Sequence, residues 1–293
     1  MVQARRKEWI LAILLACAFS ALILWSGMSL TRENACPCNG TRAMNDIFGL
    51  HWHPINTSKI NVIYQIPLDV LPDDPRWPVR QAEYIRAVSE TLEHPDVSSV
   101  HLLTEQVLDQ VRLYAMLPSA YHHKIRTFNL NKRMAYADAV RYANRFLAGC
   151  ITVMANADIV LVGPEWGWLS VKHMQDKFYG LARHEAPLCA TGCDCSTNWE
   201  GCHDSFVFVP PLLGGDPFLE AISYRMGGIW GGENRFLWEV KNYNDKLDMT
   251  NPCLTLVTRH WHCMEKGLYR PDQDNRRVNL RRSIVLPPRH IEV

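Results

Sequence analysis

Hydrophobic and polar positions from residue 59 onward follow two different periods along the chain. Short apolar runs rich in β-branched residues predict strands, and longer segments with apolar residues at helical spacing predict helices. The expected strands cover residues 59–66, 97–103, 124–128 and 151–162, and the expected helices cover residues 80–92, 107–116 and 136–147. This alternating order predicts an α/β domain with a mostly parallel mixed sheet flanked by helices.

The run from Ile151 to Val162 is apolar except for Asn156 and Asp158. Such a run predicts a single strand buried on both faces, and ligands of open α/β sheets bind at the carboxyl ends of such strands. Alternate residues of an extended chain point the same way, so we expect the Asn156 amide oxygen and the Asp158 carboxylate to meet one cation. Oxygen ligands of this kind suit Mg²⁺ or Mn²⁺ carrying phosphates. A polar turn between two strands is the alternative interpretation.

The N-terminal region predicts a membrane anchor. Residues 9–29 are almost wholly apolar, which matches the ~20 residues that cross a bilayer. Basic residues at positions 5–7 precede this stretch, so the positive-inside rule places residues 1–8 in the cytosol. A cleaved signal peptide has a shorter apolar region and a small-residue cleavage site, and neither is obvious here. The expected order is a tail, a transmembrane signal anchor, a lumenal stem over residues 30–58 and a single globular domain over residues 59–293.

Sequence motifs beyond the anchor support a lumenal location. Asn39 and Asn56 begin Asn-x-Ser/Thr acceptors for N-glycosylation, and both lie in the expected stem. The chain has 10 cysteines, and only Cys17 falls in the anchor. In an oxidising lumen the others are expected to form disulfides. Because their number is odd, we expect at least one without an intrachain partner, and Cys150 is predicted as a buried free thiol.

The cluster of cysteines between residues 189 and 202, followed by His203, has a competing interpretation as a zinc site. Its spacing matches no paired Cys-x2-Cys pattern, so disulfides are favoured. The formal charge of the whole chain is only +1 at pH 7. This balance predicts no basic face for nucleic acid.

The order of these elements and motifs resembles the GT-A glycosyltransferases. Asn156-Ala-Asp158 stands at the Asp-x-Asp position of that family, and residues 204–208 look like its acceptor-side strand. Residues 230–234, Trp-Gly-Gly-Glu-Asn, are similar to the Trp-Gly-Gly-Glu motif of galactosyl- and N-acetylgalactosaminyltransferases. His260-Trp-His262 resembles the late histidine that completes the family's metal site. The resemblance covers about residues 59–270, and Asn156 in place of the first aspartate is its one departure.

The resemblance implies a role for each of these residues. Asp158 with His260 or His262 would hold Mn²⁺ or Mg²⁺ at the diphosphate of a nucleotide sugar. Glu233 is the expected general base for the acceptor hydroxyl, and Asp204 is a second catalytic carboxylate. The further expected contacts are Asn156, Asp158, Asp138 and Arg183 for the donor, and Trp230 and Asn234 for the acceptor.

Some of these residues have simpler interpretations. Asp138 and Arg141 have the spacing of a solvated i,i+3 pair, and Glu233 is placed as an acid in the first turn of an expected helix over residues 234–240. His260 and His262 also fit a pair of surface histidines beside Cys263.

The sequence thus predicts a type II membrane glycosyltransferase of the Golgi or endoplasmic reticulum, with its catalytic domain in the lumen. The expected partners are a nucleotide-sugar donor, a glycan or glycoprotein acceptor, and the membrane. The alternative is a catalytically inactive lumenal carbohydrate-binding or scaffold protein with the same fold, which Asn156 keeps open. A zinc hydrolase of the His-Glu-x-x-His type is not indicated, because the sequence lacks that pattern.

Overall fold

The computed structural model of the chain describes residues 58–68, 74–187, 189, 192–227, 231–263 and 282–291. Within this part of the chain, none of the helices is both long enough and apolar enough to cross a membrane. The predicted anchor over residues 9–29 and the acceptors Asn39 and Asn56 lie outside the described residues.

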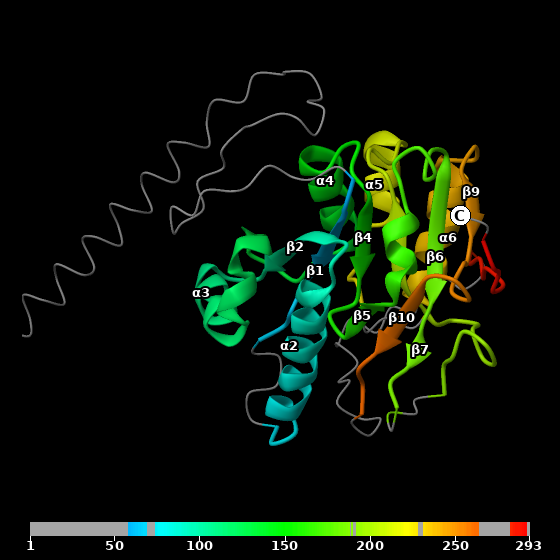
Figure 1. Cartoon of the computed structure of the whole chain (residues 1–293). Helices are drawn as coiled ribbons and strands as arrows, with labels where there is room; N and C mark the ends of the chain where they lie inside the picture. Colours follow the sequence, from blue (N-terminus) through cyan, green and yellow to red (C-terminus); the bar gives the residue numbers. More distant parts are fainter. Residues whose placement is uncertain are drawn as a thin grey trace, which may run out of the picture. The chain divides into compact units, whose positions relative to one another are not determined.

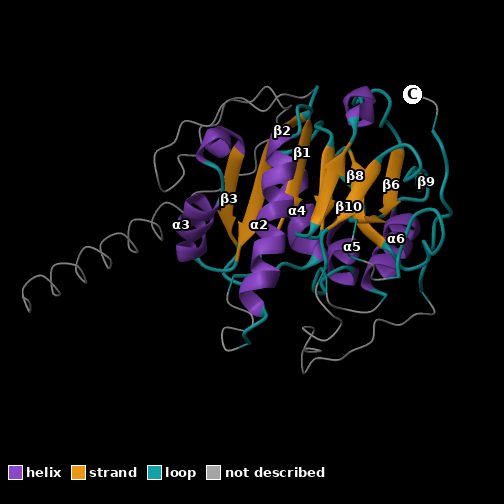
Figure 2. Cartoon of the chain, turned by 60° about the horizontal axis from the view of Figure 1, so that its bottom comes forward, coloured by secondary structure: helices purple, strands orange, loops and turns teal. Residues whose placement is uncertain are grey.

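The described part is built on a seven-stranded mixed sheet with the strand order β3-β2-β1-β4-β8-β6-β9 (Figures 1 and 2). In that order the strands are β3 (Ile125–Asn129), β2 (Val97–Thr104), β1 (Ile60–Tyr64), β4 (Thr152–Ala155), β8 (His203–Phe208), β6 (Lys177–Ala182) and β9 (Asp248–Thr250). The first four strands run parallel to one another, β8 is antiparallel to both of its neighbours, and β9 is parallel to β6. The predicted α/β fold with a mostly parallel sheet is confirmed.

Helices pack on both faces of this sheet. The helices are α2 (Trp77–Glu93), α3 (Val107–Met116), α4 (Tyr136–Phe146), α5 (Gly215–Ala221) and α6 (Gly232–Tyr243), and two short 3-10 helices cover Ser119–Lys124 and Pro164–Trp168. Val62 and Tyr64 of β1 belong to a core with residues of α2 and α3, whereas Ile63 belongs to a second core with residues of α4, α5 and α6. Alternate strand residues therefore enter opposite cores, as the pleat requires. Figure 2 shows α2 on the near face of the sheet.

Two helices begin earlier than predicted. Helix α2 begins at Trp77 rather than near Arg80, because Pro78 falls in its first turn, where a missing N–H removes no helical hydrogen bond. Helix α6 begins at Gly232 rather than at Asn234. The preceding residue, Gly231, has a φ of 78°, a left-handed conformation that glycine adopts without steric cost.

The prediction of one continuous strand over residues 151–162 is wrong. The chain forms β4 and then a separate strand β5 (Ile159–Val162), joined by a turn that Ile159 N closes on the Asn156 carbonyl at 3.1 Å. Strand β5 leaves the large sheet and joins β10 (Val257–His260) and β7 (His184–Glu185) in a three-stranded sheet of order β5-β10-β7. The alternative interpretation, a polar turn between two strands, is the one that holds.

Disulfides join the cysteines of the second half of the chain. The pairs within the described residues are Cys189–Cys263, Cys193–Cys202 and Cys195–Cys253. The zinc interpretation of this cluster is excluded, because a sulfur in a disulfide is not a thiolate ligand. The prediction of a free thiol at Cys150 is also wrong, since Cys150 is disulfide-bonded.

Candidate functional site

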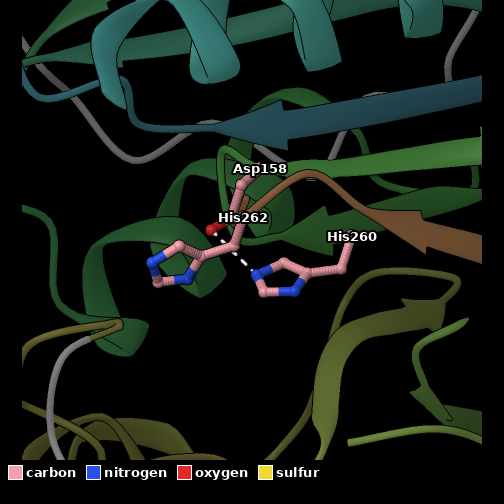
Figure 3. A group of neighbouring side chains, drawn as sticks. All are labelled: Asp158, His260 and His262. Atoms are coloured by element: carbon pink, nitrogen blue, oxygen red, sulfur yellow. Dashed lines mark hydrogen bonds and ion pairs between the residues drawn. The ribbon is translucent and has the colours of Figure 1, made fainter. Parts of the chain in front are cut away.

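Asp158, His260 and His262 converge on one point beside the large sheet (Figure 3). One ligand atom from each of the three residues lies within 4.8 Å of the others, and no other group of this kind occurs among the described residues. His260 Nε2 is 3.1 Å from Asp158 Oδ2. All three side chains are buried, with exposed fractions of 5%, 3% and 7% respectively. We call these residues the Asp-His-His cluster.

Backbone pairing between distant segments forms the cluster. Asp158 lies in the turn between β4 and β5, and β10 runs antiparallel to β5 with His260 opposite Ile159. Trp261 N donates to the Asp158 carbonyl at 2.8 Å and extends this pairing by one residue. The carboxylate and the histidines are therefore held by main-chain hydrogen bonds rather than by a flexible loop alone.

Burial and neighbouring charges shift the pKa of each residue in the cluster. Burial alone would raise the pKa of Asp158, but His260 and Arg80 hold it well below its usual range. The pKa of His260 is raised, because Asp158 outweighs the opposing effect of burial. Burial and the nearby Arg80 guanidinium lower the pKa of His262 to about 4. At neutral pH His262 is therefore a neutral imidazole, the form that binds a metal ion.

Arg80 is the main site residue that the sequence prediction missed. It is 3% exposed, and it donates to Asp158 Oδ2, to Glu83 Oε2 at 2.7 Å and to the Trp261 carbonyl at 2.9 Å. Glu83 in turn accepts the backbone N–H of Cys263 at 2.8 Å. A signal for both residues existed in the sequence, because Arg80 and Glu83 fall on the buried stripe of α2, where solvated charges are not expected.

The extended alternation on which the shared cation of Asn156 and Asp158 was predicted is absent. The turn at residues 156–159 interrupts it. Asn156 Nδ2 donates instead to Asp204 Oδ1 at 2.7 Å. Its position at the end of β4, opposite Asp204 of the antiparallel strand β8, sets up this contact.

A chain of charged contacts connects Asp204 to the Asp-His-His cluster. Arg183 donates from Nη1 to Asp204 Oδ2 and from Nε to Glu185 Oε1, the latter at 3.0 Å. Glu185 Oε2 lies 3.1 Å from His260 Nδ1, the ring nitrogen that does not face Asp158. Arg183, which we expected at the donor, therefore bridges Asp204 and Glu185 in this structure.

Glu233 lies in the first turn of α6, half-buried. Burial raises its pKa to about 8, and the negative charges of Asp204 and Asp158 add to this effect against the opposing Arg183. A simple first-turn acid would be stabilised in its charged form by the helix dipole. The raised pKa is instead typical of a carboxyl group that exchanges a proton near neutral pH.

The remaining predicted site residues have other surroundings. Asp138 accepts the Ala135 backbone N–H at 3.0 Å and pairs with Lys132 at 2.9 Å, so its described contacts stabilise the start of α4. Asn234 follows Glu233 in α6, and its backbone carbonyl accepts the Ile284 N–H at 3.1 Å. Trp230 lies outside the described residues.

The Asp-His-His cluster has the donor set of a divalent cation site. It offers one carboxylate oxygen and two imidazole nitrogens, a set that suits Mn²⁺ and other transition metals better than the all-oxygen sites of Mg²⁺. Around it, in the part of the chain that the structure describes, the carboxylates of Glu83, Glu185 and Asp204 join that of Asp158. These four acids outnumber the guanidinium groups that pair with them, those of Arg80 and Arg183. This excess of negative charge favours a cation at the site.

Comparisons with known proteins find only distant similarities, and these are similarities in backbone structure. No protein-family model matches the chain, and no curated protein matches it either. Three similar solved structures are GalNAc-T7 with UDP, GalNAc and Mn²⁺, the mannosyltransferase PcManGT from Pyrobaculum calidifontis with GDP-Man and Mn²⁺, and a protein from Bacillus anthracis described as a glucose-1-phosphate thymidylyltransferase.

The sequence identities to these structures are 8%, 12% and 10%, and the TM-scores are 0.32, 0.42 and 0.40. The matches cover 43%, 72% and 75% of this chain and 23%, 58% and 96% of the other chains. The chain thus spans less than two thirds of the length of the first two. At these values, none of the likenesses assigns a function by itself.

Proposed function

We propose that this protein is a glycosyltransferase of GT-A type that moves a sugar from a nucleotide-sugar donor to a hydroxyl of a glycan or glycoprotein, assisted by a divalent metal ion. The observation that carries the proposal is the convergence of Asp158, His260 and His262 beside the end of β4 in a mostly parallel α/β sheet. Ligands of such sheets bind at the carboxyl ends of the strands.

The metal ion has a specific task in this reaction. When bound by Asp158, His260 and His262, Mn²⁺ would neutralise the negative charge that develops on the departing nucleoside diphosphate. The buried position of the three ligands strengthens this effect, because the effective dielectric constant is lower there than in water. Arg80, which donates a hydrogen bond to Asp158, adds a further positive charge beside the proposed metal ligands.

Glu233 is the proposed general base. In a single displacement that inverts the anomeric carbon, the acceptor oxygen forms a bond to that carbon, the bond from the carbon to the diphosphate breaks with its electron pair, and the hydroxyl proton passes to Glu233. A base with a pKa of about 8 takes up a proton effectively near neutral pH. Asp204, whose charge contributes to the raised pKa of Glu233, accepts hydrogen bonds from Asn156 and Arg183. We assign it to positioning the acceptor.

A lumenal location is part of the proposal. We propose a type II protein of the Golgi or endoplasmic reticulum membrane, anchored by residues 9–29. The disulfides at Cys189–Cys263, Cys193–Cys202 and Cys195–Cys253 support this location, because such bonds persist in oxidising compartments and are rare in the cytosol.

Calorimetry on the detergent-solubilised full chain tests the proposal against the inactive alternative. The chain would be titrated with a panel of nucleotide sugars, with Mn²⁺ and with EDTA. We expect one donor to bind only with Mn²⁺, and release of its nucleoside diphosphate to accelerate with a glycan acceptor. Binding of a glycan without binding of any donor would instead establish a carbohydrate-binding protein and overturn the proposal.

A further inference from the structure

Strand β7 places Glu185 directly beside one of the proposed metal ligands. Strands β7 and β10 are parallel, with Glu185 paired to His260, and Ala186 N donates to the His260 carbonyl at 3.1 Å. This pairing brings Glu185 Oε2 to 3.1 Å from His260 Nδ1. The contact joins two strands that lie 75 residues apart in the sequence.

The contact determines which nitrogen of His260 is available to a metal ion. A carboxylate oxygen only accepts, so Nδ1 must carry the hydrogen in this contact. By the same rule Nε2 carries a hydrogen toward Asp158 Oδ2, 3.1 Å away, in the metal-free chain, and this is the hydrogen that a cation held by the Asp-His-His cluster would replace. A carboxylate on the far nitrogen of a histidine ligand fixes the ring orientation and increases the basicity of the ligand.

Glu185 is itself held in place. Its other carboxylate oxygen, Oε1, accepts Arg183 Nε at 3.0 Å, and Arg183 continues to Asp204. The side chain of Glu185 is only 13% exposed, so water competes little for either oxygen. The carboxylate therefore has a defined orientation toward the His260 ring.

We propose that Glu185 is a positioning residue that sets the metal affinity of the site through His260, without binding the metal itself. The proposal rests on the metal site of the proposed function, but not on sugar transfer. Losing such a carboxylate typically weakens metal binding by about 10- to 100-fold.

The test measures Mn²⁺ binding to the full chain by the electron paramagnetic resonance signal of free Mn²⁺. We expect Glu185→Gln to raise the Kd for Mn²⁺ by about 10- to 100-fold, with an unchanged melting temperature in EDTA. Saturating Mn²⁺ should then restore kcat in any transfer assay, because the three ligands remain intact. A damaged fold would not be rescued in this way.

Asp216→Asn is the matched control. Asp216 is an exposed acid in the first turn of α5, so its replacement also removes one carboxylate charge, and it is not part of the cluster. Its replacement should leave the Mn²⁺ affinity unchanged. Glu185→Asp, which keeps the charge but shortens the reach to His260, provides a second variant if Glu185→Gln does not fold, and it should also weaken binding.

The outcomes separate the two proposals. If the wild-type chain binds no Mn²⁺, the metal-assisted function fails and the role of Glu185 fails with it. If the wild-type chain binds Mn²⁺ and the folded Glu185 variants bind it equally well, only the role of Glu185 is overturned.

Discussion

Asn156 and Asp204 are joined twice, by a side-chain hydrogen bond of 2.7 Å from Nδ2 to Oδ1 and by a backbone hydrogen bond of 3.0 Å from Asn156 N to the Asp204 carbonyl. The side-chain bond needs a donor at position 156, and an aspartate there would instead place a second carboxylate against Asp204. The asparagine at the first position of the Asp-x-Asp-like motif is thus explained by its neighbour rather than by the metal.

Asn156→Asp is therefore expected to destabilise the protein rather than improve the metal site. The substitution replaces a donor with a like charge, and we expect a loss of about 1–3 kcal/mol in the free energy of unfolding at pH 7. The loss should shrink at pH 4, where protonation relieves the repulsion. Denaturant unfolding at both pH values measures it, and a variant as stable as wild type at pH 7 would contradict this account.

Asp158→Asn should lower the transfer rate by about 10²-fold or more and abolish Mn²⁺ binding, because the substitution removes the only carboxylate of the Asp-His-His cluster. We expect the chain to remain folded, since Arg80 keeps its contacts with Glu83 and the Trp261 carbonyl. Nucleoside diphosphate release and circular dichroism would be compared with those of Asp216→Asn, an exposed charge loss on α5. Near-normal turnover of the Asp158 variant would refute the assignment.

Glu233→Gln should lower kcat by about 10²- to 10⁴-fold while the Kd of the donor stays nearly constant. The amide keeps the size of the side chain but takes no proton from the acceptor. Asp204→Asn should act mainly on the KM of the acceptor. Steady-state kinetics and donor titration on both variants distinguish the two roles. If only the Asp204 variant lost turnover, Asp204 would be the base and Glu233 would position the acceptor.

The pH dependence of kcat/KM provides a separate test of Glu233. A base must be ionised to act, and its pKa is about 8, so activity should rise as the pH increases through that value. Burial and the charge of Asp204 both raise this pKa, so Asp204→Asn should move the acidic limb of the profile to lower pH. An unshifted limb in this variant would show that another group controls the profile. The profile would be recorded at saturating Mn²⁺ for both proteins.

Endoglycosidase treatment tests the proposed topology. Expressed in a secretory host, the full chain should shift in mobility, and the double variant Asn39→Gln with Asn56→Gln should not. An unglycosylated wild-type chain, with its large domain open to a cytosolic protease, would refute the lumenal location.

Much of the fold could be predicted from the sequence, because burial on the two faces of a sheet leaves a periodic hydrophobic pattern. Segments such as 97–103 and 136–147 became β2 and α4 with small changes at their ends. The pattern left the break at residues 156–159 undecided, since Asn156 and Asp158 in an otherwise apolar run fit either one strand or a polar turn between two strands. Periodicity reports burial, and both strands that flank the turn are buried.

The composition of the site was harder to predict than its position. His260 meets Glu185 only because β10 pairs with β7, and no local pattern encodes pairing between segments so far apart. Arg80 could have been recognised as a charge on the apolar stripe of α2, but its contact with Asp158 could not. The local sequence around Cys150 likewise did not indicate that this cysteine is disulfide-bonded.

The Cys189–Cys263 bond has a consequence for how the protein matures. Cys263 directly follows His262, and Cys189 lies four positions after Glu185, so one covalent link joins the segments on both sides of the Asp-His-His cluster. A newly made chain in a reducing environment lacks this link. Oxidation should therefore precede metal loading during biosynthesis, and material produced in a bacterial cytosol should carry an incompletely organised site even where its sheet has folded.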